Sequence, residues 1–118
     1  MPTTIKKKPT GRGTTKQSFK FKSKVIVWGG NPHDHSAWRF ARVPERVSAK
    51  IKKMQEGRMR RGWGAVYAHA LIRESEWQTS IFPDRHSATY VLPLKKSVRK
   101  AEGLYDDMEI KVSMDVWF

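Results

Sequence analysis

Apolar and polar residues alternate over long stretches of this chain, and the alternation predicts a fold built mainly of β-strands. From Phe19 to Val27 the odd positions are mostly apolar, while lysine occupies the even positions up to Lys24. The last residues, 108–118, show the same period of two, with apolar side chains at the even positions. Such a period places one set of side chains on the buried face of a strand. These two segments therefore predict the first and last strands of the fold.

Further strands are predicted between these two, separated by turn signals rich in glycine and proline. They are residues 37–43, 63–72, 77–82 and 89–92. In the first of them we expect Trp38 and Phe40 to face the core and Arg39 to point outward. The second is apolar on both faces, which predicts a wall strand packed on both sides or in contact with another molecule.

Two short helices with basic outer faces are predicted, each beginning with proline. They span Pro44–Gln55 and Pro93–Glu102, and each has an apolar stripe that is enough to dock it on a barrel. Gly103 stands at the usual left-handed position after the second helix. Strands followed by a proline-initiated basic helix thus occur twice, with Val43–Val47 a faint echo of Leu92–Lys96. The repetition predicts two similar halves.

Length and composition favour one small intracellular domain. A chain of 118 residues supports a single modest core. It has no apolar run near the roughly 20 residues that cross a bilayer, and no signal peptide is recognisable. Cysteine is absent, which excludes disulfides and zinc–thiolate sites and suits a reducing compartment. We expect a cytoplasmic protein.

The net charge of +13 is concentrated at the front of the chain. Residues 1–24 carry eight lysines and arginines and no acid. Residues 1–18 are also nearly free of apolar side chains, so we expect a flexible basic arm there and a single barrel domain over residues 19–118. Such an arm binds phosphate backbones through counterion release. A solubilising tail is the alternative.

A second basic cluster, Arg58, Arg60 and Arg61, follows the first predicted helix. Three arginines so close together repel one another unless an anion or an acidic partner lies nearby. The cluster is therefore a candidate anion-binding surface, with a solvated loop as the alternative. The outer faces of both helices add further lysines that are able to meet phosphates.

Catalytic and metal-binding patterns are weak. His33 and His35 flank Asp34, but alternate residues of an extended loop point apart and no third ligand is evident. His69 in a wall strand is more often a packed residue than a base, and Ser80 is more often a sheet side chain than a nucleophile. We predict no catalytic residues, no metal and no cofactor.

Four motifs in the second half of the chain resemble those of a known family. They are Arg61-Gly62-Trp63-Gly64-Ala65-Val66, Trp77-Gln78-Thr79-Ser80-Ile81-Phe82-Pro83-Asp84, Tyr90-Val91-Leu92-Pro93-Leu94-Lys95 and Val98-Arg99-Lys100-Ala101-Glu102-Gly103-Leu104. In order and spacing they are similar to domain of unknown function 1905, a family of small bacterial β-barrels. The resemblance implies a mainly β double-split barrel of about six or seven strands with two short helices. Its architecture is related to regulators of the AbrB and MazE type.

The motif residues and the arginine cluster define a candidate binding site. Its members are Arg58, Arg60, Arg61, Trp63, Trp77, Thr79, Ser80, Phe82, Asp84, Tyr90, Lys95 and Arg99. If the loop of Arg61 converges with the turn after Phe82, aromatic walls and cations would suit a flat anionic ligand, such as a nucleotide or an unpaired base with its phosphate. Alternatively the tryptophans fill the barrel and Arg61 pairs with Asp84.

Three functional hypotheses follow. The first is a non-enzymatic module that binds nucleic acid through the arm, the arginine loop and the helix faces. The second is a small-anion binder or an enzyme that uses the region of Arg61, Trp63 and Ser80. The third is a protein-interaction domain, because related barrels occur fused to a bacteriocin-protection module. One chain contains both halves of the barrel, so we expect a monomer or a weak homodimer and no contact with membranes.

Overall fold

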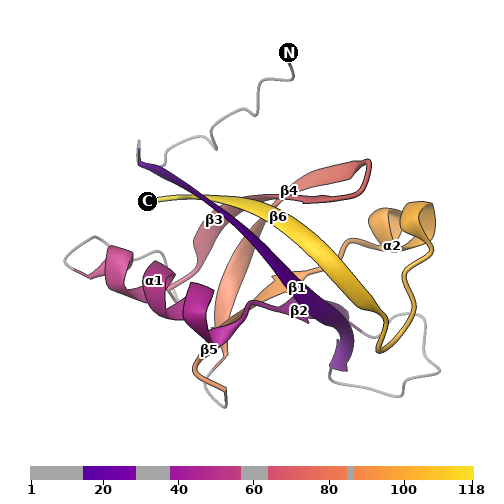
Figure 1. Cartoon of the computed structure of the whole chain (residues 1–118), viewed down its shortest axis with the longest axis horizontal. Coiled ribbons are helices and arrows are strands. Elements are labelled where there is room, and N and C mark those ends of the chain that lie inside the picture. Colours follow the sequence, from indigo (N-terminus) through magenta and orange to yellow (C-terminus); the bar gives the residue numbers. More distant parts are fainter. Residues whose placement is uncertain (1–14, 29–37, 57–63, 85–86) are drawn as a thin grey trace.

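The computed structural model describes residues 15–28, 38–56, 64–84 and 87–118, and its strands close into a barrel (Figure 1). In chain order the elements are β1 (Lys16–Trp28), β2 (Trp38–Arg42), α1 (Glu45–Gln55), β3 (Val66–Ile72), β4 (Ser75–Asp84), β5 (Thr89–Pro93), α2 (Lys96–Glu102) and β6 (Glu109–Trp117). Every strand pair is antiparallel, in the order β1-β2-β5-β4-β3-β6. The predicted mainly β barrel with two short helices is confirmed.

The barrel is split at two places. At each place one strand changes its hydrogen-bonded partner part of the way along its length. β1 pairs with β6 as far as Lys24 and then with β2 from Val25. β4 pairs with β3 as far as Ile81 and then with β5 from Phe82. We call the place where β1 leaves β6 for β2 the first split, and the place where β4 leaves β3 for β5 the second split.

The two halves of the chain are related by a pseudo-twofold axis. Each half runs strand, strand, helix, strand, and Figure 1 shows α1 and α2 on opposite sides of the barrel. The axis passes through the pair Ala41 and Leu92 in the β2–β5 ladder. A twofold rotation about it exchanges the two flanking pairs, Phe40 with Pro93 and Arg42 with Val91. A residue a given number of positions before or after Ala41 corresponds to the residue the same number of positions before or after Leu92. Arg39 therefore corresponds to Tyr90, Val43 to Leu94, and Ser48 to Arg99.

Backbone hydrogen bonds obey the same symmetry. Val43 N donates to Tyr90 O at 2.9 Å, and Leu94 N donates to Arg39 O at 2.9 Å. The repeat is therefore real, but its predicted alignment was wrong. Pro93 is the last residue of β5 and α2 begins only at Lys96, so Pro93 does not correspond to Pro44, which caps α1.

The core is formed by the inner face of the barrel and the helix residues that cover its open sides. Phe19, Phe21 and Val25 of β1 face inward as predicted, as do the even-numbered residues of β6. Val47 and Ile51 of α1 and Val98 of α2 are buried against them. Gly103 ends α2 with φ 62°, the left-handed stop that was predicted.

The predicted facing of β2 is wrong. Ala41 and Val43 are fully buried in the core, and Arg39 has the same parity, so its side chain lies on the inner side and is 9% exposed. Trp38 has the opposite parity and is 66% exposed. Phe40 is buried, as expected, but beneath Trp38, with which its ring is stacked. The small apolar residues Ala41 and Val43, which fit the barrel interior, indicate the inner face of β2 better than the large aromatic residues do.

The N-terminal boundary also differs from the expectation. β1 begins at Lys16, so residues 16–18 of the predicted arm belong to the barrel wall. Residues 1–14 lie outside the described part of the chain. No helix in the described part is long and apolar enough to cross a membrane.

Candidate functional site

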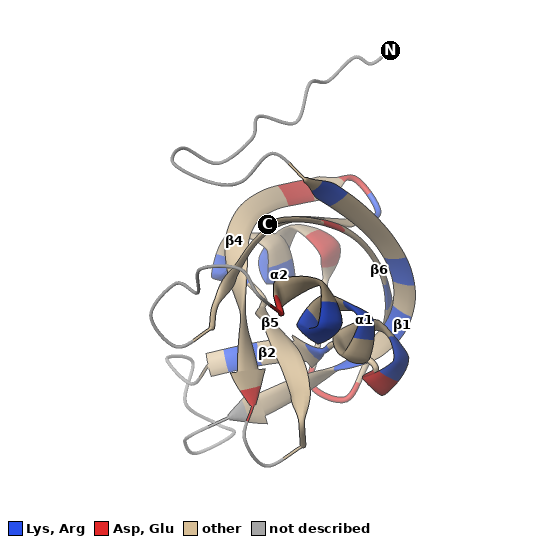
Figure 2. Cartoon of the chain, turned by 90° about the vertical axis from the view of Figure 1, so that its left-hand side faces the viewer, with Lys and Arg blue, Asp and Glu red and all other residues tan. Residues whose placement is uncertain are grey.

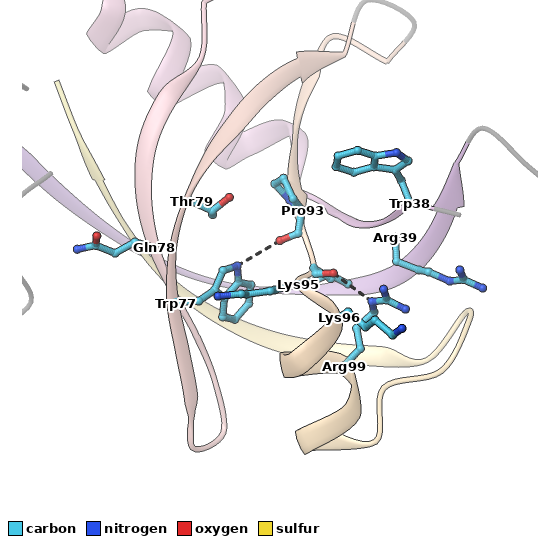
Figure 3. Close-up of a pocket in the computed structure, with 10 residues that line it drawn as sticks. Trp38, Arg39, Trp77, Gln78, Thr79, Pro93, Lys95, Lys96 and Arg99 are labelled. Atoms are coloured by element: carbon cyan, nitrogen blue, oxygen red, sulfur yellow. Dashed lines mark hydrogen bonds between the residues drawn. The ribbon is translucent and has the colours of Figure 1, made fainter. Parts of the chain in front are cut away.

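A pocket of about 430 Å³ opens in the second split (Figure 3). Its walls come from the start of β2, the first half of β4, the end of β5 and α2. The lining residues are Trp38, Arg39, Trp77, Gln78, Thr79, Pro93, Leu94, Lys95, Lys96 and Arg99. This volume is within the range that small-molecule sites occupy.

The pocket exists because the β4–β5 ladder is short. The two strands pair only from Phe82 to Asp84 on the β4 side, so Trp77–Thr79 and Pro93–Lys95 face each other without a ladder. Trp77 Nε1 donates to the carbonyl oxygen of Pro93 at 3.3 Å and so bridges the gap. Trp77 is 7% exposed and belongs to the core, so it forms the closed inner end of the pocket.

Trp38 supplies an open aromatic wall. Its ring stacks on Phe40 with the centroids 6.0 Å apart and the planes 11° apart. Among the residues whose side chains are described, only Trp38 and Tyr105 are large hydrophobic side chains with high exposure. A tryptophan held flat by a second ring and left open on its other face is suited to stack a planar ligand.

Four basic side chains surround this wall. Arg39 is paired with Asp106 at 3.2 Å, and Arg99 Nε donates to the carbonyl oxygen of Leu94 at 3.1 Å. Lys95 and Lys96 are exposed at the entrance. Within the described ranges, Lys95, Lys96 and Arg99 form no ion pair. The pocket therefore has an excess of positive charge.

Arg99 carries an electrostatic cost in this position. Burial lowers the pKa of its guanidinium below the ordinary value, the neighbouring charge of Arg39 lowers it further, and Asp106 partly opposes both effects. A guanidinium stays charged in proteins despite such a shift. An anion bound beside Arg99 would offset this electrostatic cost. The pocket is thus chemically matched to a ligand with a planar ring and a negative group.

The predicted site residues fall into separate places. Trp77, Thr79, Lys95 and Arg99 do come together and line the pocket. Ser80 and Phe82 lie further along β4, half-buried and outside its lining. Arg58, Arg60, Arg61 and Trp63 lie outside the described residues, so their predicted part in a site stays a prediction.

Asp84 belongs to a different polar cluster. Its carboxylate is 5% exposed and accepts hydrogen bonds from Arg42 Nη1 at 3.0 Å and Ser87 Oγ at 2.8 Å. Arg42 also donates to Ser87 and, at 3.0 Å, to Thr89 Oγ1. The cluster joins β2 to the turn between β4 and β5, which is a structural role.

Tyr90 is in the first split and not at the pocket. It is 5% exposed, its hydroxyl donates to Gln55 Oε1 at 3.1 Å, and its backbone N donates to Ser48 Oγ at 3.0 Å. Ser48 Oγ in turn donates to the carbonyl oxygen of Val43 at 2.9 Å. These contacts seat α1 on the barrel.

The predicted list of site residues left out Trp38, Arg39 and Lys96. The signal for the first two was available in the parity of β2, since Ala41 and Val43 are the residues that a narrow barrel interior accepts. Lys96 was expected on the basic outer face of a helix that could meet phosphates, but α2 begins three residues later than predicted.

In the described ranges, no group of three or more His, Cys, Asp and Glu side chains is close enough to hold a metal ion. His69 is buried, and neither of its ring nitrogens has a hydrogen-bond partner among the described residues; Glu76 Oε1 lies 3.6 Å from its Nε2. His33 and His35 lie outside the described residues.

Comparison with curated proteins finds no match. A family model matches residues 21–114, a range that includes most of β1, all of β2 to β5, both helices and the first two thirds of β6. That range also contains every residue that lines the pocket. Because the match covers well over half of the chain, the protein belongs to the family described as Domain of unknown function (DUF1905).

Proposed function

We propose that this protein is a non-enzymatic binding module that takes a nucleotide unit of single-stranded nucleic acid in the pocket of the second split. The unpaired base would stack on Trp38, and its phosphate would lie against Arg99, Lys95 and Lys96. Base–aromatic stacking combined with a basic track is the usual way in which single strands are held without sequence preference.

One observation carries the proposal: a 66%-exposed, ring-supported tryptophan lies in the same pocket as a partly buried arginine and two lysines that form no ion pair with any described residue. Exposing a large ring costs free energy that packing it inward would recover. Gathering cations in a concavity costs electrostatic free energy as well. A ligand with a base and a phosphate relieves both costs at once.

A free nucleotide has the same chemistry and is the second candidate. The pocket volume of about 430 Å³ suits one nucleotide unit. We favour the polymer because the chain carries a net charge of +13, which attracts a polyanion far more strongly than a small ligand. The arm and the arginine loop remain predicted contacts of that polymer.

The test is a fluorescence titration of the full chain with a short single-stranded oligonucleotide, a nucleoside monophosphate and inorganic phosphate, each at two salt concentrations. We expect the oligonucleotide to quench tryptophan emission and to bind more weakly as salt rises. Trp38→Ala should remove most of the quenching and weaken binding about tenfold, which is the stacking contribution of one base.

A matched pair of double variants separates the pocket from general charge. Lys95→Ala/Lys96→Ala and Lys52→Ala/Lys53→Ala remove the same charge, the first at the pocket and the second from exposed positions on α1. The first should weaken binding several times more than the second. Equal losses, or full affinity in Trp38→Ala, would refute the pocket as the site. Equal affinity for the monophosphate and the oligonucleotide would assign the pocket to free nucleotides.

A further inference from the structure

A second basic surface lies on the outer face of β1 and β6, apart from the pocket, whose lining comes from β2, β4, β5 and α2. We propose that this surface binds the phosphate backbone of double-stranded nucleic acid. It consists of five exposed lysines, which we call the lysine face: Lys16, Lys20, Lys22, Lys24 and Lys111. This site does not depend on the proposed role of Trp38.

The strand period puts these lysines together. Phe19, Phe21 and Val25 of β1 face the core, so the even-numbered residues point outward. Alternate residues of a strand are about 7 Å apart, and blue segments recur along β1 in Figure 2. The result is a row of cations on one side of a stiff, curved wall.

The register of the β1–β6 ladder makes this arrangement unfavourable for the protein alone. Lys22 is directly opposite Lys111, and like charges in such a pair destabilise a sheet. The acids on this face do not cancel the charge. Glu109 is opposite Lys24 alone, and Asp115 is 5% exposed and accepts a hydrogen bond from Ser18 Oγ at 2.6 Å.

The other half of the barrel shows that the fold does not require these charges. Val25 and Ile81 are both buried where β1 and β4 change partners. The residue three positions before Ile81 is Gln78, and its cross-strand partner is His69. Gln78 and His69 therefore stand where Lys22 and Lys111 stand in the first half.

The chemistry of the face selects its partner. Over residues 16–24 and 109–117, where β1 pairs with β6, no large hydrophobic side chain is exposed. A membrane-binding surface normally adds apolar residues that enter the interface, and a site for single strands adds aromatic rings. Lysines alone fit a duplex, whose bases are stacked inside and whose phosphates line the outside.

The experiment measures the affinity of the full chain for a short DNA duplex between roughly 50 and 200 mM salt. Lys22→Ala/Lys111→Ala should weaken binding about tenfold at the low end and reduce the slope of log K against log salt by about two, one for each lost phosphate contact. Lys52→Ala/Lys53→Ala, with the same loss of charge on α1, should change both quantities much less. Equal effects of the two double variants would overturn the proposal.

A charge reversal at Lys22 distinguishes a binding role from a structural one, because the two roles predict opposite shifts of the urea midpoint. Lys22→Glu replaces repulsion of Lys111 by attraction, so we expect a higher urea midpoint together with weaker duplex binding. A lower midpoint accompanied by the loss of binding would overturn the inference, because the effect would then be damage to the sheet. Vesicles rich in phosphatidylserine, or polyglutamate, bound as tightly as the duplex at equal charge would also overturn it.

The two proposals fail separately. Trp38→Ala should leave duplex binding unchanged, and Lys22→Ala/Lys111→Ala should leave the tryptophan quenching by a single strand largely intact. If duplex binding is absent while single strands still quench Trp38, the inference about the lysine face is wrong and the proposed function stands.

Discussion

The two splits of the barrel are built on one backbone plan and filled in opposite ways. In the first split, Tyr90 is buried under α1 and its hydrogen bonds run to Gln55 and Ser48. In the second split, the corresponding positions are Arg39 and Arg99, and a pocket lies between them and Trp38. The first split is filled by buried neutral side chains, and the second contains a basic pocket.

The comparison shows that the fold does not require basic side chains in a split. The first split shows that neutral side chains with satisfied hydrogen bonds close such a gap. The helix-to-strand contact is kept in both halves, because Ser48 Oγ donates to Val43 O and Arg99 Nε donates to Leu94 O, its symmetry equivalent. A serine is sufficient for that bond, so the rest of the Arg99 guanidinium is available for another purpose.

The largest expected effect concerns Tyr90 and its counterpart Arg39. Tyr90→Ala removes a buried ring and a hydrogen-bonded hydroxyl, so we expect the free energy of unfolding to fall by about 3–5 kcal/mol. Arg39→Ala breaks the ion pair with Asp106, whose side chain is 41% exposed and can be solvated by water, so we expect a smaller loss than for Tyr90→Ala. Urea denaturation measures both. Equal losses would mean that the second split contributes to the fold as much as the first.

Much of this architecture was accessible from sequence because strand periodicity and turn residues are local signals. The inward residues of β1 and β6, the extent of α1 and the stop at Gly103 were all predicted. The facing of β2 was not predicted. A strand of five residues has too few positions to show which face is buried, and the large rings of Trp38 and Phe40 pointed to the wrong one. The alignment of the halves followed the prolines, whereas the backbone symmetry follows Ala41 and Leu92.

The candidate site was less predictable because it depends on long-range geometry. Trp77, Thr79, Lys95 and Arg99 were expected in one site and do meet, since family-like motifs carried them. Tyr90 and Asp84 were grouped with them by the same motifs but serve packing and a polar cluster instead. A motif records what a family shares, and sequence alone does not divide that set between fold and ligand.

A second effect compares Ser48 with Arg99. Ser48→Ala leaves a buried backbone donor at Tyr90 and an acceptor at Val43 without their shared partner, so the free energy of unfolding should fall by about 2 kcal/mol. Arg99→Ser keeps a hydroxyl near Leu94 O and should cost less than half of that. Paired urea titrations test the ranking, and a greater loss for Arg99→Ser would contradict the argument that its charge is spare.

The same Arg99→Ser variant should affect binding more than stability. It makes the second split resemble the first, and it removes a charged donor whose hydrogen bonds to a phosphate are worth about 1.5–3 kcal/mol. We therefore expect affinity for a single-stranded oligonucleotide to fall about tenfold or more. Fluorescence titration against wild type measures this change. Unchanged affinity with an intact fold would remove Arg99 from the site.

The smallest effect concerns the acid that moderates the pocket. Asp106 lies 3.2 Å from Arg39 and is the carboxylate that opposes the lowering of the Arg99 pKa. Asp106→Asn should raise affinity for an oligonucleotide a few-fold, because the pocket becomes more positive, and cost up to about 1 kcal/mol of stability through the lost ion pair. Asp107→Asn is the matched control, since it changes the same charge one residue away, and its φ of 69° is one that asparagine adopts readily. An equal gain from both variants would show that net charge, and not the Arg39–Asp106 contact, sets the affinity.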